Sequence, residues 1–370
     1  MPTDLLVHDR DLILATMGRG LWVLDDLTPL RQAARIERGA RAFLFTPAPA
    51  IRVRANQNKD TPLPPEEPAG ENPPAGAVID YWLAGDVKDP LHIEIRDERD
   101  AVVRRYSSDE TPTQPKAIRY FAPQWIRPAD PPSARAGAHR FVWDLRHPRP
   151  KAPEYEYSIS TAWGADTPLQ PQGALVPPGE YRIVLRAEGR EYRAPLSVRP
   201  DPRLRFDPGS ASAGLDLTRA TEKSLARVAD ASLEVEYLKQ QLDALAPRLA
   251  ANGAGGGAAP ALATLKDRVA PLTEGEGDSG PRLKSIADAL RALHDDLEGS
   301  DAAPTEPQRQ VLTECDERID RALALWHGAG DSALAALNAA LVNAGLTPIV
   351  IPPVEQIHPG VASGHGRELP

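Results

Sequence analysis

The 370-residue sequence is poor in cysteine, in aromatic residues and in long apolar runs. Its single cysteine, Cys315, excludes an internal disulfide framework and any metal site built from several cysteines. No run of 18 or more apolar residues occurs, so the sequence predicts no transmembrane segment. The first residues lack a basic stretch followed by an apolar one, so we expect no signal peptide in this chain. The net charge of -9 argues against nucleic acid as a partner.

The usual signatures of catalytic sites are also missing. The sequence has no His-Glu-x-x-His zinc motif, no Gly-x-Ser-x-Gly turn, no Walker loop and no dinucleotide-binding glycine fingerprint. Its 8 histidines are scattered without the spacing of metal ligands. We therefore assign no catalytic residue, no metal and no cofactor. Cys315 falls on an apolar helical stripe, which favours a buried, unreactive thiol over a nucleophile.

Composition changes along the chain and suggests where its parts divide. Residues 41–200 hold 24 of the 39 prolines, which favours strands and loops. Residues 201–370 hold 25 acidic and 16 basic side chains, and so carry the whole acidic surplus. These shifts predict four parts: a strand meander at 1–40, a β-sandwich domain at 41–205, a helical bundle at 212–347 and an extended tail at 348–370.

Short strand patterns fill the first two parts. Those at 5–8, 12–16 and 21–24 would form one meander, too small to bury a core of its own. Between residues 77 and 198, six to eight short segments alternate with period two between Pro and Gly turns, which is typical of an immunoglobulin-like β-sandwich. Its expected core includes Tyr81, Trp82 or both, Phe141 or Trp143, and Tyr181.

Leucine stripes with a helical period replace the strand pattern after residue 212. Apolar residues recur every three or four positions, which predicts an antiparallel helical bundle. Gly253–Gly257 is interpreted as a flexible break, and Gly328 is expected to end the third helix. Thr305 and Gln308 resemble a capping box at the start of that helix. The stripes lie at 225–249, 283–297, 312–326 and 334–341.

Two pairs of residues are considered as candidates for catalysis or ligand binding. Asp25 and Asp26 are neighbours, and neighbouring side chains on a strand point to opposite faces. The two carboxylates therefore cannot converge on one glycosidic bond without a turn, and a turn or capping role before Thr28 is favoured. Tryptophan rings can stack on sugars, so Trp125 and Trp163, which lie in expected loops, are our candidate ligand-binding residues.

The segment at 4–30 carries a family resemblance. It resembles the closing blade of sortilin-like, BNR-repeat β-propeller proteins of the glycosyl hydrolase or sialidase-like type. Met17 stands where that family usually has histidine. Segments 140–146, 177–181 and 198–203 resemble the C-terminal sandwich of the same proteins. The motif residues are Gly18, Arg19, Gly20, Trp22, Asp25 and Asp26.

The resemblance implies a multidomain β plus α chain made of a terminal propeller-blade remnant at 1–40, an immunoglobulin-like β-sandwich and an antiparallel helical bundle. A sialidase-like site needs several blades, so we expect no activity from this chain alone. The preferred function is a non-catalytic C-terminal accessory region that binds carbohydrate, another protein or the upstream blades. Its full-length protein would be periplasmic or extracellular. The alternatives are part of an active glycosidase whose catalytic blades lie upstream, and a helical interaction or oligomerisation module.

Overall fold

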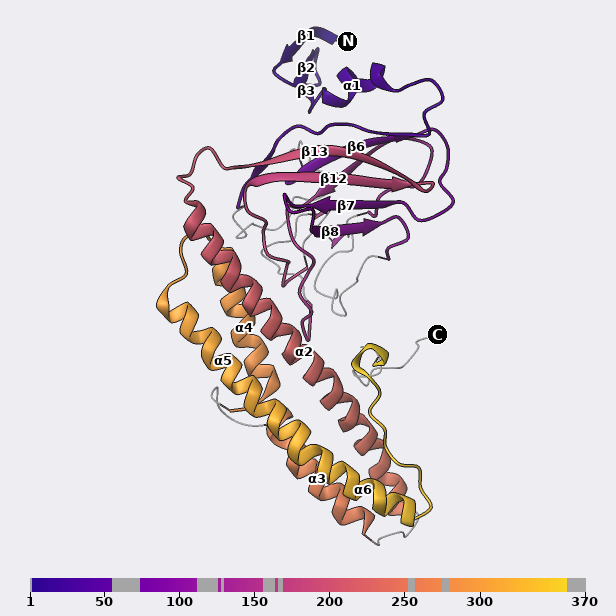
Figure 1. The fold of residues 1–370 in the computed structure, drawn as a ribbon, viewed down its shortest axis with the longest axis vertical. Helices are drawn as coiled ribbons and strands as arrows, with labels where there is room; N and C mark the ends of the chain where they lie inside the picture. Colours follow the sequence, from indigo (N-terminus) through magenta and orange to yellow (C-terminus); the bar gives the residue numbers. More distant parts are fainter. Residues whose placement is uncertain are drawn as a thin grey trace. The chain divides into compact units, whose positions relative to one another are not determined.

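The chain combines β-sheets and helices in two compact units, as expected of a multidomain β plus α protein (Figure 1). The computed structural model describes residues 2–54, 74–111, 126–127, 130–155, 164–165, 169–251, 257–274 and 280–357. The first unit consists of Met1–Arg149 and Glu156–Leu215. The second consists of Pro150–Tyr155 and Asp216–Pro370.

A three-stranded antiparallel sheet opens the first unit. It contains β1 (Pro2–His8), β2 (Asp11–Thr16) and β3 (Leu21–Leu24). β1 and β3 are exposed along their whole length, and β2 is half-buried. The short helix α1 (Thr28–Gln32) and a 3-10 turn at Ala33–Arg35 follow, and α1 was not expected from the sequence.

The proline-rich region forms two larger sheets. Three antiparallel strands take the order β10-β6-β4. Five strands take the order β5-β13-β12-β7-β8, in which only the β5–β13 pair is parallel. The bounds are β4 (Ala42–Leu44), β5 (Ala50–Arg52), β6 (Ala77–Leu83), β7 (His92–Arg96), β8 (Val102–Ser107), β10 (Gly137–Trp143), β12 (Gly179–Ala187) and β13 (Arg190–Pro200), with a separate two-stranded pair of β9 (Ile126–Arg127) and β11 (Gly164–Ala165).

The two larger sheets share one hydrophobic core. β6 alternates between buried and half-buried side chains, so Tyr81 enters this core and its neighbour Trp82 does not. Trp143 is fully buried, with its ring centroid 5.6 Å from that of Tyr181. Phe141 also lies in this core, so the predicted aromatic core is confirmed.

In the described residues, five α-helices share a hydrophobic core of their own, built mainly from leucine. The capping box of Thr305 and Gln308 is confirmed at the start of α5. Gly328 does not end a helix, because the chain continues through the π-helical turn Leu325–Gly330 into the next one. The helices are α2 (Pro208–Ala251), α3 (Ala258–Thr273), α4 (Leu283–Glu298), α5 (Glu306–Ala324) and α6 (Asp331–Asn343).

The segment after α6 packs onto the helical core in its described part. Ile349 and Ile351 contact that core, and the amide of Asn338 forms two hydrogen bonds with the backbone of Ile349, each 2.8 Å long. Residues 358–370 of the expected tail lie outside the described residues. Of the helices that the structure describes, none is both long enough and apolar enough to cross a membrane.

Candidate functional site

Gly18 and Gly20, in the segment that carries the resemblance, build the turn between β2 and β3. Gly18 and Gly20 have φ of +80° and +70°, a left-handed conformation that L side chains rarely adopt. The Thr16 hydroxyl donates to the carbonyl of Gly20 at 2.8 Å, and the Trp22 indole N–H donates to the carbonyl of Arg19 at 3.2 Å. These residues therefore shape a tight turn, and the Trp22 ring remains 61% exposed.

Asp26 lies in the turn that leads into α1. Its φ is +59°, and its carboxylate accepts hydrogen bonds from both the backbone N–H and the hydroxyl of Thr28. The backbone N–H of Asp26 donates to the Asp11 carboxylate at 3.0 Å. The expected turn role is confirmed for Asp26. Asp25 beside it is half-buried.

The two candidate sugar-stacking residues, Trp125 and Trp163, lie outside the described residues, so their placement stays a prediction. Within the described ranges, no group of three or more His, Cys, Asp or Glu side chains is arranged to hold a metal ion. Cys315 is buried as expected, and this burial raises the pKa of its thiol.

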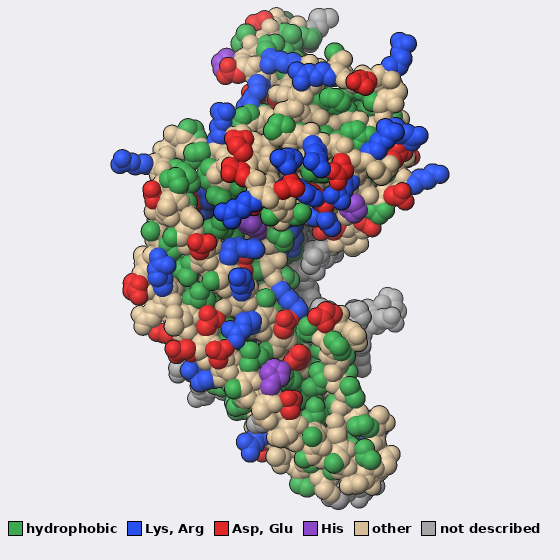
Figure 2. All heavy atoms as spheres, in the orientation of Figure 1, with side chains coloured by type: hydrophobic (Ala, Val, Ile, Leu, Met, Phe, Trp, Pro, Cys, Tyr) green, Lys and Arg blue, Asp and Glu red, His purple; other side chains and the backbone are tan. Residues whose placement is uncertain are grey.

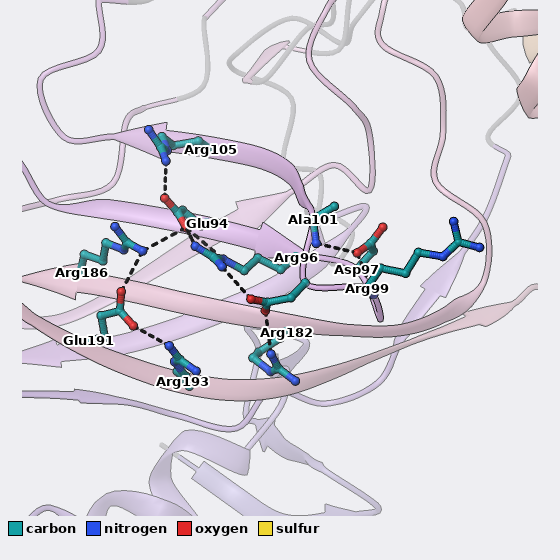
Figure 3. Close-up of polar contacts among 11 residues, drawn as sticks. Glu94, Arg96, Asp97, Arg99, Ala101, Arg105, Arg182, Arg186, Glu191 and Arg193 are labelled. Carbon is teal, nitrogen blue, oxygen red and sulfur yellow. Dashed lines mark hydrogen bonds and ion pairs between the residues drawn. The ribbon is translucent and has the colours of Figure 1, made fainter.

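The most developed polar site lies on the five-stranded sheet, centred on Glu94 of β7 (Figure 3). The Glu94 side chain is only 1% exposed. Arg96 donates to it from the same strand at 2.6 and 3.1 Å, and Arg105 donates from β8 at 2.5 Å. The Arg186 guanidinium on β12 lies 3.7 Å away. Three arginines from three strands thus converge on one carboxylate.

Two further carboxylates extend this site across the sheet. Asp100 accepts from Arg96 at 3.0 Å and from Arg182 at 2.8 Å. Glu191 accepts from Arg193 at 2.7 Å and pairs with Arg186 at 2.8 Å. We call these side chains the arginine network: Glu94, Arg96, Asp100, Arg105, Arg182, Arg186, Glu191 and Arg193.

The arginine network is more cationic than anionic but internally paired. Five guanidinium groups face three carboxylates, and each of the five has a carboxylate partner. Figure 2 shows Lys and Arg side chains interspersed with Asp and Glu over this part of the molecule. Such pairing favours a role in holding the strands together over one in capturing an anion.

Strand register explains the position of Glu94. Glu94 lies directly opposite Arg105 on one side and Val184 on the other. Burial raises the pKa of Glu94, but hydrogen bonds from Arg96 and Arg105 outweigh it and leave the pKa below its ordinary value. The carboxylate is therefore ionised near neutral pH, and it is unsuited to act as a general acid.

Comparison with known proteins found no relative. No protein family matches this chain, and neither a similar curated protein nor a similar solved structure was found. Functional inference therefore depends on the chain's own residues.

Proposed function

We propose that this chain is the non-catalytic C-terminal accessory region of a secreted, sortilin-like or BNR-repeat protein of the glycosyl hydrolase type. In this proposal β1–β3 are the remnant of the last propeller blade. The two sheets that share a core form an immunoglobulin-like β-sandwich, and α2–α6 form an antiparallel helical bundle. The upstream blades of the full-length protein are the first partner.

One observation carries the proposal: the β1–β3 sheet exposes apolar side chains on both of its faces. Leu5, Leu6 and Val7 are consecutive on β1, and each is more than half exposed. The residues of β3 are likewise consecutive, and Leu21 is 72% exposed. Since neighbouring side chains on a strand point to opposite faces, exposed apolar side chains occur on both faces of the sheet.

A propeller blade requires apolar side chains on both faces of its sheet. Blades are arranged around a central axis, so a blade packs against neighbours through both faces. A soluble single-layer sheet with water on one side would instead alternate polar and apolar residues. The family motif lies on this same sheet, with Gly18 and Gly20 in its turn. The exposed apolar surface and the motif therefore support the same proposal.

Two acids of the first unit are already engaged by neighbouring groups, which supports a non-catalytic role for them. Asp26 is engaged in the turn before α1, and Glu94 is held by arginines. Glycoside hydrolysis generally needs two carboxyl groups about 5–10 Å apart on either side of one bond.

The experiment is an assay of the purified chain with aryl glycosides and sialosides, beside the Asp25→Asn variant. We expect no turnover above background from either protein. Turnover that survives further purification and is lost in Asp25→Asn contradicts the non-catalytic role. Sequencing upstream of Met1 supplies the second readout, because propeller-like repeats in the same reading frame are expected there.

A further inference from the structure

An open surface pocket of about 430 Å³, called the cavity below, lies beside α1, and its three arginine side chains are exposed. Three segments form its walls: the β1–β2 turn at Arg10, the stretch from Thr28 to Arg35, and the stretch from Thr46 to Pro49. Its volume is large enough for a small molecule, which would remain partly exposed to solvent in this open pocket.

Hydrogen bonds hold the three walls together. The backbone N–H of Leu27 donates to the carbonyl of Arg10 at 2.6 Å, and the Arg31 guanidinium donates to the carbonyl of Asp9 at 3.1 Å. The buried amide of Gln32 forms two hydrogen bonds with the backbone of Thr46, at 2.8 and 2.9 Å. These bonds fix the cavity without using the side chain of Arg10 or Arg35.

The charge of the lining is of one sign. Arg10, Arg31 and Arg35 line the cavity, and no lining residue is acidic. In the described part of the chain, the side chains of Arg10 and Arg35 form no hydrogen bond or ion pair. This sets them apart from the paired guanidinium groups of the arginine network.

The remaining lining residues suit the uncharged part of a small ligand. Thr46 carries a hydroxyl group, and Pro47–Pro49 adds an apolar wall. Asp26 accepts a hydrogen bond from Thr28 but does not line the cavity. A guanidinium group presents several N–H donors in a fixed plane, which matches carboxylate and phosphate oxygens in pairs.

We propose that this cavity binds a small molecule carrying carboxylate or phosphate groups, with Arg10 and Arg35 as its main ligands. Arg31 adds the third positive charge while it holds the wall at Asp9. The apolar wall contacts the uncharged part of the ligand. This inference does not rest on the proposed function.

The test is calorimetric titration of the full 370-residue chain with citrate and, separately, with inorganic phosphate at low salt. Citrate represents carboxylate ligands, and phosphate represents phosphorylated ones. We expect one saturable site for at least one probe, and the probe that binds identifies the class. Arg10→Gln and Arg35→Gln should each weaken binding about tenfold or more, because each removes a charged hydrogen-bond donor.

Arg38→Gln is the matched control, since Arg38 is an exposed arginine close in sequence that does not line the cavity. It should leave affinity unchanged. If a Gln variant fails to fold, Arg35→Lys replaces it, and this variant should bind more weakly because it loses the planar fork. Three results overturn the proposal: neither probe binds saturably, Arg38→Gln weakens binding as much as Arg35→Gln, or Arg10→Gln and Arg35→Gln both leave the affinity unchanged.

Discussion

Glu94 on β7 lies directly opposite Arg105 on β8, and its carboxylate accepts a 2.5 Å hydrogen bond from the Arg105 guanidinium. Glu94 is buried, whereas Arg105 is 60% exposed. The buried Glu94 carboxylate therefore relies on the exposed Arg105 guanidinium to compensate its negative charge. Without the Glu94 charge, Arg105 and Arg186 stay partly exposed to water, and Arg96, which is only 17% exposed, keeps its ion pair with Asp100. We therefore expect a moderate loss of stability rather than collapse of the sheet.

Glu94→Gln should lower the free energy of unfolding of the sheet unit by about 1–3 kcal/mol, the usual effect of losing hydrogen bonds to a charged group. Urea titration followed by far-ultraviolet circular dichroism measures this loss. Glu98→Gln, at an exposed position in the turn that follows β7, is the control and should change stability by less than about 0.5 kcal/mol. Equal effects from the two variants would contradict a bracing role for Glu94.

The acid stability of the sheet should also depend on Glu94. Because its folded pKa is lowered from 4.5, its contribution to stability is present above that pH and is lost as the pH falls through the folded pKa. Glu94→Gln should therefore lose less stability on acidification than the parent chain. Parallel curves of stability against pH for the two proteins would show that Glu94 does not titrate in this way.

His294 should make the helical unit sensitive to alkaline pH. Burial lowers its pKa, but Asp295 and Glu298 on α4 and Glu222 on α2 outweigh burial and raise the pKa to about 9. Its ring nitrogens lie 3.7 Å from Glu222 and 3.9 Å from Asp295. A raised folded pKa means that the stability is complete below the unfolded value of 6.5 and is lost as pH rises through about 9.

The expected loss across this window is on the order of 3 kcal/mol. His294→Gln should remove most of the dependence, as measured by urea titration of the helical unit at several pH values. NMR titration of the His294 ring gives its pKa directly. A ring that titrates near 6.5 in the folded protein would refute the prediction.

The two tryptophans of the small β10-β6-β4 sheet should differ sharply. Trp143 is fully buried in the shared core, whereas Trp82 is only half-buried on the opposite face of β6. Trp143→Ala should cost about 3–5 kcal/mol because it leaves a cavity, and Trp82→Ala should cost clearly less. Thermal unfolding of both variants checks this order. Similar costs would mean that the burial of Tyr81 and Trp143 does not define the core.

Leu290→Asp should unfold the helical unit. Leu290 is fully buried on α4, and a carboxylate without a partner is costly to bury at that position. Ala292→Asp introduces the same charge at an exposed position on the same helix and should be tolerated. The helical signal in circular dichroism distinguishes the two variants. Retained helicity in Leu290→Asp would contradict the assignment of Leu290 to the core.

Helix α3 shows where sequence patterns failed. Its buried residues Leu262, Leu265, Val269 and Leu272 follow helical spacing, so the signal was present. None of the stripes predicted from the sequence lies between Gly253–Gly257, interpreted as a flexible break, and residue 283; of that glycine-rich run only Gly257 lies within the described residues. Pro260 lies in the first turn, where a missing N–H costs little.

The arginine network could not be predicted from single strands. The alternation at residues 91–97 correctly places Ile93 and Ile95 in the core and Glu94 on the other face. Burial of Glu94 depends on Arg105 and Arg186, which belong to other strands. The cavity beside α1 likewise depends on contacts between Gln32 and Thr46, which no local pattern specifies.

Hydrogen exchange of β1–β3 tests the central claim most directly. The comparison is between this chain and the same chain extended upstream in its reading frame. If β1–β3 are a blade remnant, their amides should exchange much faster than those of β6 and β12 in the short chain, because apolar side chains on both faces lack a covering layer. In the extended protein they should become as protected as β6. Protection equal to that of β6 in the short chain, or no gain on extension, would contradict the account.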